Sequence, residues 1–127
     1  MIKRYSRPEM IKVWSQQEKY KIWFEIEAYA CEAMESISLI PKGTTKNVLK
    51  ASGIDYDIDT IDAIEKITKH DVIAFLTYLS KFIGESSRFV HQGLTSSDVL
   101  DTCFNIQLVN ASNYLEKGLQ DLLDVIK

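Results

Sequence analysis

The C-terminal segment carries the feature that most restricts the fold, a helical pattern that runs over residues 96–127. It contains one glycine, Gly118, and no proline or other stop signal. Its apolar positions are Val99, Cys103, Ile106, Leu115, Leu119, Leu122, Leu123 and Ile126. A periodic stretch of this length without a terminator is typical of a helical bundle or coiled coil. Because the pattern is still running at Lys127, we expect a fragment of a longer polypeptide.

The rest of the chain also reads as helical, since glycine and proline are scarce and no segment shows sustained apolar alternation. A short helix is expected over residues 8–14, with Pro8 in its first turn. Ser15 and Glu18 then match a capping box that opens a second helix. Pro41 and Gly43 are expected to end that helix. The apolar stripe between these ends consists of Tyr20, Trp23, Phe24, Ile26, Ala30, Cys31 and Met34.

Further helices are expected over residues 45–51, 58–68 and 71–83, the last of them closed by Gly84. The segment 85–93 reads as a connection. The sequence thus predicts an all-α protein, with an N-terminal helical domain over residues 1–94 and the truncated start of a central helical-bundle domain over residues 95–127.

Composition excludes several classes of function. The 127 residues are 46% hydrophobic and 26% charged, which is ordinary for a soluble globular domain. The net charge of −3 gives no general attraction for nucleic acid or acidic membranes, and no apolar run suits a signal peptide or a bilayer span. We therefore expect a cytoplasmic protein. Cys31 and Cys103 lie in apolar helical patterns, and no metal-ligand cluster or glycine-rich phosphate loop occurs.

Hydroxyl groups gather just before the long C-terminal helix, in the run V-H-Q-G-L-T-S-S-D over residues 90–98. The start of a helix leaves backbone N–H groups unpaired and carries partial positive charge, so such hydroxyls can form a site for a carboxylate or phosphate. The alternative is that Thr95, Ser96 or Ser97 simply caps the helix, with Asp98 in its first turn.

Both histidines, His70 and His91, fall at junctions between helices. There an imidazole can transfer protons or donate hydrogen bonds to an anion, or it can merely cap loop backbone groups. Lys69 and Asp71 flank His70, and we expect Asp71 to be the N-cap of the following helix. Lys69 could pair with an acidic neighbour or supply charge to a bound phosphate.

A third cluster precedes the first helix, where Arg4 and Tyr5 stand in the run K-R-Y-S-R-P-E-M. Arginine recognises phosphate and carboxylate by paired hydrogen bonds, and tyrosine offers a ring face and a hydroxyl. The alternative is a frayed, solvated N-terminus.

Four segments in this order carry a resemblance that covers essentially the whole chain: R-Y-S-R-P-E-M, W-F-E-I-E-A-Y-A-C-E-A, I-E-K-I-T-K-H-D-V-I-A-F and V-H-Q-G-L-T-S-S-D-V-L-D-T. The chain resembles the N-terminal part of the adenylosuccinate lyases, the purine-pathway family of the fumarase and aspartase superfamily. The resemblance implies elimination of fumarate from adenylosuccinate, giving AMP, and from the succinyl-carboxamide intermediate of purine synthesis. It implies β-elimination without a cofactor, and a homotetramer built on a long helical bundle.

The resemblance also assigns roles to residues. Arg4 and Tyr5 would contact the substrate, residues 69–71 would line the nucleotide phosphate and catalytic region, and Thr95 and Ser96 would hold the succinyl carboxylate. The substrate-binding set is therefore Arg4, Tyr5, Lys69, His70, Asp71, Thr95 and Ser96.

For catalysis the resemblance implies only a supporting role of His70 in binding and orientation. The principal acid, a different histidine, and the base, a serine on a mobile loop, would lie beyond Lys127. His91 would have a secondary, ligand-facing or loop-fixing role. The fragment alone is therefore expected to be inactive. Two alternatives stay open: another superfamily lyase, such as argininosuccinate lyase or fumarase, and a helical interaction module without chemistry.

Overall fold

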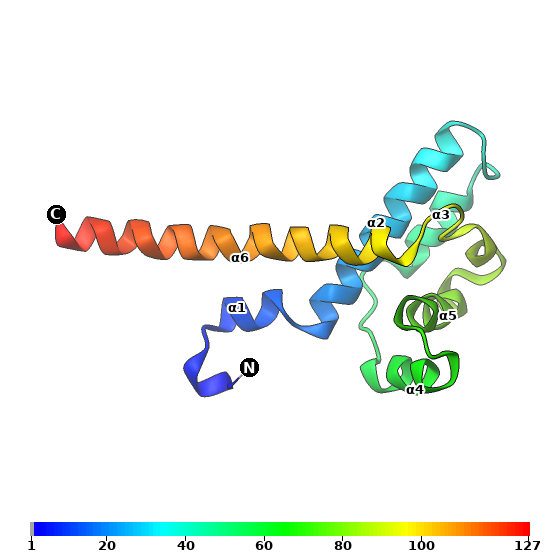
Figure 1. Cartoon of the computed structure of the whole chain (residues 1–127). Helices are drawn as coiled ribbons and strands as arrows, with labels where there is room; N and C mark the ends of the chain where they lie inside the picture. The colour runs from blue at the N-terminus through cyan, green and yellow to red at the C-terminus, as the bar shows by residue number, and fades with distance from the viewer. Residues whose placement is uncertain (1) are drawn as a thin grey trace.

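The computed structural model describes residues 2–127, and this part of the chain is helical without strands (Figure 1). One end of the molecule is a compact cluster of helices, from which a long straight helix extends as an arm. The α-helices are α1 (Pro8–Val13), α2 (Gln16–Ser36), α3 (Thr44–Val48), α4 (Ile58–Thr68), α5 (Asp71–Ile83) and α6 (Ser96–Ile126). Three short 3₁₀ helices are η1 (Lys3–Tyr5), η2 (Leu49–Ala51) and η3 (Gly84–Phe89). The predicted all-α fold is confirmed.

Aromatic side chains form the centre of the cluster, where α2 packs beside α5. Tyr20 of α2 stacks on Phe75 of α5 with ring centroids 5.4 Å apart and planes 10° from parallel. Trp23 meets the same Phe75 ring edge-on at 5.5 Å. All three side chains are almost completely buried. Such offset and edge-on pairs add to the stabilisation that burial of the large rings provides.

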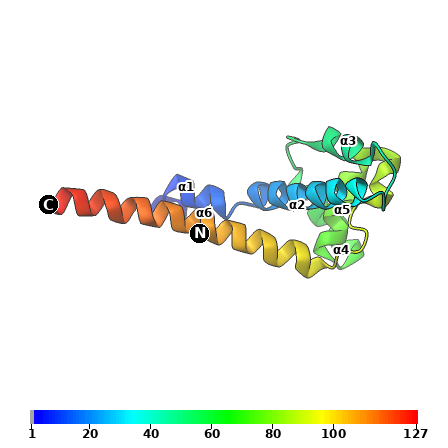
Figure 2. The same cartoon turned by 90° about the horizontal axis from the view of Figure 1, so that it is seen from above.

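The first half of α6 belongs to this core, while its second half does not. Val99 and Cys103 are buried against the cluster, whereas the apolar residues beyond Ala111 are exposed. Figure 2 shows the second half of α6 extending away from the cluster. The division of the chain into domains at residue 94 stays a prediction.

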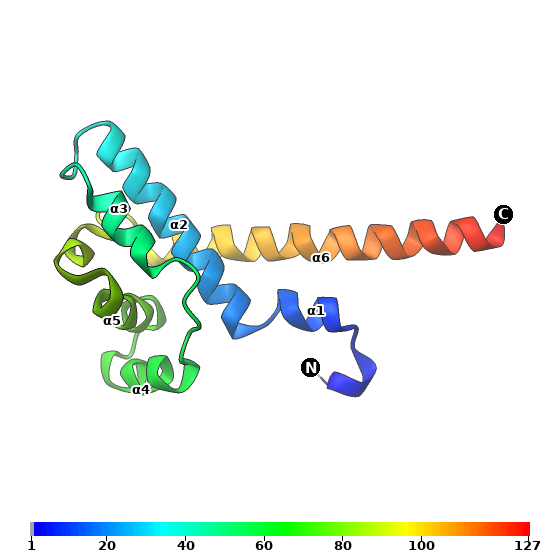
Figure 3. The same cartoon turned by 180° about the vertical axis from the view of Figure 1, so that it is seen from behind.

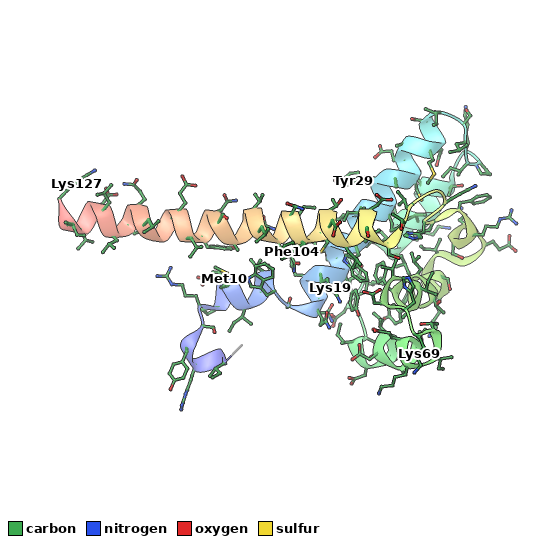
Figure 4. The ribbon with its side chains drawn as sticks, viewed as in Figure 1. Met10, Lys19, Tyr29, Lys69, Phe104 and Lys127 are labelled. Carbon is green, nitrogen blue, oxygen red and sulfur yellow. The ribbon has the colours of Figure 1, made fainter. Side chains whose placement is uncertain are left out.

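The helix α1 lies against α6 rather than on the cluster. Gln107 of α6 is buried and donates a 2.8 Å hydrogen bond to the carbonyl of Val13. The ring of Trp14 packs against Phe104, with centroids 6.2 Å apart (Figure 4). The N-terminal segment is therefore held beside the arm, as Figure 3 also shows from behind.

One predicted helix end is wrong, and one predicted helix is divided into two. The helix α2 ends at Ser36, not at Pro41 and Gly43, because Ser38 adopts a left-handed backbone (φ 60°). The N–H groups of Ser38 and Leu39 then return to carbonyls of the last turn, at 3.0 and 2.9 Å, as in a Schellman motif. The helix predicted over residues 45–51 is split into α3 and η2, and Gly43 precedes it in a left-handed conformation.

The remaining boundaries confirm the predictions closely. Ser15 caps α2 and accepts a hydrogen bond from the N–H of Glu18. Asp57 caps α4, and Gly84 closes α5 with φ 74°. Both cysteines are buried. Over residues 2–127, no helix combines the length and the apolar character that a bilayer span requires.

Candidate functional site

The fold brings together two of the predicted clusters, at the point where α5 and α6 begin. His70 immediately precedes α5, and Ser96 is the first residue of α6. Nε2 of His70 lies 3.1 Å from Oγ of Ser96, although 26 residues separate them in the sequence. A ring nitrogen and a hydroxyl from different helix starts thus form one small polar site.

His70, and not Asp71, is the N-cap of α5, so that prediction is wrong. The backbone of His70 is extended (φ −153°, ψ 119°), as a cap requires, whereas Asp71 is already helical. Nδ1 of His70 accepts a 3.4 Å hydrogen bond from the N–H of Ile73. Because Nδ1 accepts, the proton of the neutral ring is on Nε2, which can donate to Ser96. The capping role of His70 is therefore present, and Nε2 of the same ring faces Ser96, while a role of His70 toward a ligand stays a prediction.

Asp71 adds negative charge to the first turn of α5. Its Oδ1 accepts a 2.8 Å hydrogen bond from the N–H of Val72 and lies 3.5 Å from Nδ1 of His70. An acidic group at this position interacts favourably with the positive end of the helix. Asp71 therefore supports the cap of α5 from beside His70.

Lys69 ends α4 in a left-handed conformation, with φ 55°. The side chain is exposed and lines a surface hollow together with Asp62, Glu65 and Lys66. Figure 4 places it at the outer edge of the cluster, at the end of α4. Pairing of Lys69 with one of these acidic neighbours stays a prediction. The contact with a nucleotide phosphate stays a prediction.

In the hydroxyl-rich run before α6, neighbouring residues have different roles. Thr95 is the N-cap and forms a capping box with Asp98, whose carboxylate accepts a 2.8 Å hydrogen bond from the N–H of Thr95. The next residue, Ser96, directs its hydroxyl to His70 instead. The N-cap and the hydroxyl that faces His70 thus belong to adjacent residues, and Ser97 is exposed.

His91 is tied into the core by a residue that the sequence analysis missed. Nδ1 of His91 lies 2.6 Å from Oε1 of Glu27, which is completely buried in α2. Burial raises the pKa of the Glu27 carboxyl, and the hydrogen bond to His91 acts in the opposite direction. The available signal was an acidic residue between the apolar positions Phe24 and Cys31 of one helix.

Arg4 and Tyr5 are not brought to the His70–Ser96 site in this chain. The Arg4 guanidinium lies over the ring of Tyr5, 4.7 Å from its centroid, and the Tyr5 side chain is exposed. Figures 1 and 2 both place this segment well away from the start of α5. The contact of Arg4 and Tyr5 with a substrate therefore stays a prediction.

Comparison with known proteins shows to which family the chain belongs. Residues 3–127 match the sequence model of the lyase family. The chain is 42% identical to the adenylosuccinate lyase of Bacillus subtilis (strain 168) over 127 residues, which is 100% of this chain and 29% of that protein. It is 41% identical to the adenylosuccinate lyase of Thermotoga maritima over 126 residues, or 99% of this chain and again 29% of the relative. The chain thus spans under a third of the length of these relatives. By a match that covers nearly every residue, it belongs to the lyase family.

Proposed function

We propose that this chain forms the N-terminal part of an adenylosuccinate lyase, a carbon–nitrogen lyase that releases fumarate from adenylosuccinate and leaves AMP. The proposal includes the same elimination from the succinyl-aminoimidazole-carboxamide ribotide. The observation that carries it is the 42% identity over the whole chain to a relative named for this activity. The meeting of His70 and Ser96 supports it, because a substrate with carboxylates needs hydrogen-bond donors of this kind.

The reaction removes a proton from the carbon next to a carboxylate and protonates the departing nitrogen. Negative charge accumulates on the carboxylate between these steps, so fixed donors lower the barrier. The start of α6 supplies partial positive charge, and the Ser96 hydroxyl stands there with His70 Nε2. Since Thr95 is engaged in the capping box, we assign the succinyl carboxylate mainly to Ser96, with Thr95 as its neighbour.

His70 has a supporting role in this proposal. Its Nδ1 is occupied by the helix cap, so Nε2–H is the group available to donate a hydrogen bond and orient the substrate. Lys69 and Asp71 belong to the same junction and complete the phosphate-binding and catalytic region. The principal acid and base are supplied by residues outside this chain.

The assembly is a homotetramer in this proposal, with a purine nucleotide and fumarate as ligands and the cytoplasm as location. Arg4 and Tyr5 then contribute to a site that another subunit completes. Two observations support this: the exposure of the Tyr5 ring, and the exposed apolar residues along the second half of α6.

The test is a substrate panel on the longer protein that contains these residues, with fumarate release measured for adenylosuccinate and for argininosuccinate. Release from adenylosuccinate supports the proposal. Activity on argininosuccinate alone would assign another lyase of the superfamily, and a folded protein active on neither substrate would favour an interaction module.

Variants at the helix start sharpen the test. We expect Ser96→Ala to lower kcat/KM for adenylosuccinate by roughly 100-fold, the order seen when one fixed donor to developing charge is removed. Ser97→Ala is the matched control, because it removes an exposed hydroxyl one residue along the same helix. Equal effects of the two variants would argue against a carboxylate contact from Ser96.

The isolated chain of 127 residues is expected to release no fumarate, because the acid and base of the proposed mechanism are absent from it. The measurement is fumarate release by the purified chain, with the Ser96→Ala chain as a control for contaminating enzyme. If the unmodified chain released fumarate and the Ser96→Ala chain did not, the active site would already be complete within these 127 residues.

A further inference from the structure

Glu27 is the one charged side chain that is fully buried among residues 4–127. One helical turn before it on α2 stands Trp23, and one turn after it Cys31, both also buried. Burial raises the pKa of the Cys31 thiol to about 11, so this neighbour stays uncharged at neutral pH. The carboxylate therefore depends on one polar partner, His91, and its Oε2 has no hydrogen bond.

The contact between them is shorter than an ordinary hydrogen bond. At 2.6 Å, the distance from Nδ1 of His91 to Oε1 of Glu27 is below the usual N–H···O range and fits a charge-assisted bond. A carboxylate can only accept a hydrogen bond, so an ionised Glu27 requires the proton on Nδ1 of His91. The exposed fraction of the His91 side chain is 15%, which leaves part of the ring within reach of solvent.

The backbone of His91 forms part of the turn before α6. Its φ of 66° is in the left-handed region, which residues other than glycine adopt uncommonly, although histidine does so more often than most. The carbonyl of His91 accepts a hydrogen bond from the N–H of Leu94 at 3.3 Å, closing the turn that leads to Thr95 and Ser96. Fixing the ring of His91 thus also fixes the approach to α6.

We propose that Glu27 is a positioning residue, which holds His91 with Nδ1–H toward α2 and leaves Nε2 of the neutral ring as a hydrogen-bond acceptor. His70 is held in the opposite tautomer, because its Nδ1 accepts from Ile73. The chain then presents an N–H donor, Nε2 of His70, at one junction and an acceptor nitrogen, Nε2 of His91, at the other. That these groups act on a substrate rests on the proposed function. The assignment of the two tautomers is independent of that function.

The experiment is a long-range ¹H–¹⁵N correlation spectrum of the histidine-labelled 127-residue chain, recorded above the pH at which the rings titrate. We expect a proton on Nδ1 of His91 and on Nε2 of His70.

Three variants separate positioning from general structure. In Glu27→Leu the Nδ1 proton signal of His91 should be lost, since free imidazole in water prefers Nε2–H. Glu27→Gln keeps an acceptor oxygen and should retain that signal. Glu25→Leu, an exposed position on the same helix, should leave both rings unchanged.

A proton on Nε2 of His91 with Nδ1 bare, in the unmodified chain, would overturn the proposal, because Glu27 would then be the donor. An unchanged tautomer in Glu27→Leu would do the same. If Glu27→Leu does not fold, the spectra of the unmodified chain and of Glu27→Gln still show which nitrogen of His91 carries the proton. Expected tautomers in a longer protein without lyase activity would contradict the proposed function alone.

Discussion

The two ring nitrogens of His70 face two different helices. Nδ1 closes the first turn of α5, and Nε2 lies beside Ser96 of α6. An asparagine can replace the first contact, because it is among the best N-cap residues, but its short side chain cannot reproduce the second. Substitutions at this residue can therefore separate a structural role from a binding role.

We expect His70→Ala to be less stable than His70→Asn by about 1 kcal/mol, the usual value of a capping side chain. Both variants should lose the contact with Ser96 and with it the activity of the longer protein. Urea unfolding of the two chains measures the first effect, and fumarate release measures the second. Equal stability of the two variants would mean that the 3.4 Å bond to Ile73 contributes nothing.

Sequence patterns located His70, Ser96 and His91 at helix junctions but could not reveal Glu27. An acidic residue in an apolar helical stripe has no readable partner, since here the partner is 64 residues away and is reached only through the fold. The N-cap of α5 was misassigned for a similar reason. Aspartate is the commoner cap, and only the backbone angles show that the helix starts one residue earlier.

At the scale of elements, the end of α2 depends on Ser38, which adopts a left-handed conformation without being glycine. The end of α2 could therefore not be predicted from the sequence, because the usual signal for a helix end is a glycine at this position. The start of α4 and the end of α5 could be predicted, because Asp57 is a common N-cap residue and Gly84 is a common residue after a helix.

Ser38→Gly should therefore stabilise the chain by about 0.5–1 kcal/mol, because glycine adopts positive φ without steric cost. Ser36→Gly is the contrasting control: in the last turn of α2 it should destabilise by a similar amount. Thermal or urea unfolding measures both. A loss of stability in Ser38→Gly would show that the flexibility of the unfolded chain outweighs the relief of strain.

Glu35 links the end of α2 to the start of α3. Its two carboxylate oxygens accept 2.7 Å hydrogen bonds from the N–H groups of Gly43 and Thr45, and these bonds hold the pKa of Glu35 below its usual value. A carboxyl whose pKa is lower in the folded than in the unfolded state stabilises the fold above the unfolded pKa. That contribution is lost as the pH falls through the folded pKa.

Between about pH 6 and pH 3, the unmodified chain should consequently lose more stability than Glu35→Gln, which has no carboxyl to protonate at this position. Urea unfolding at a series of pH values measures the difference. Glu32→Gln, at an exposed position of the same helix, is the control and should follow the unmodified chain. Parallel pH profiles for all three proteins would contradict a cap by Glu35.

For the whole molecule, the main feature is the contrast between a closed cluster and an uncovered arm. The sequence predicted that α6 would be long, and its apolar spacing predicted a bundle partner. It did not predict that α1 lies along α6, because that packing depends on Gln107 reaching the carbonyl of Val13 across the fold. The position of Arg4 and Tyr5, which precede α1, could not be predicted for the same reason.

The exposed residues Leu115, Leu119, Leu122 and Ile126 recur at steps of four and three, as in a heptad seam. We expect the chain to bind a hydrophobic dye and to self-associate in analytical ultracentrifugation. Leu119→Glu should weaken both, whereas Gln120→Glu adds the same charge beside the seam and should have little effect. A strict monomer without dye binding would contradict this expectation.

The residues that anchor α6 to the cluster and to α1 are Val99, Cys103, Gln107 and Ala111, one in every four. Contacts so spaced prevent the helix from turning about its own axis. A helix of 31 residues is a rod of about 46 Å, and its distant half inherits that fixed rotation. The angle between the apolar seam near Ile126 and the hydroxyl of Ser96 is thereby set within a single element. Whatever covers the seam will meet the site at one defined orientation.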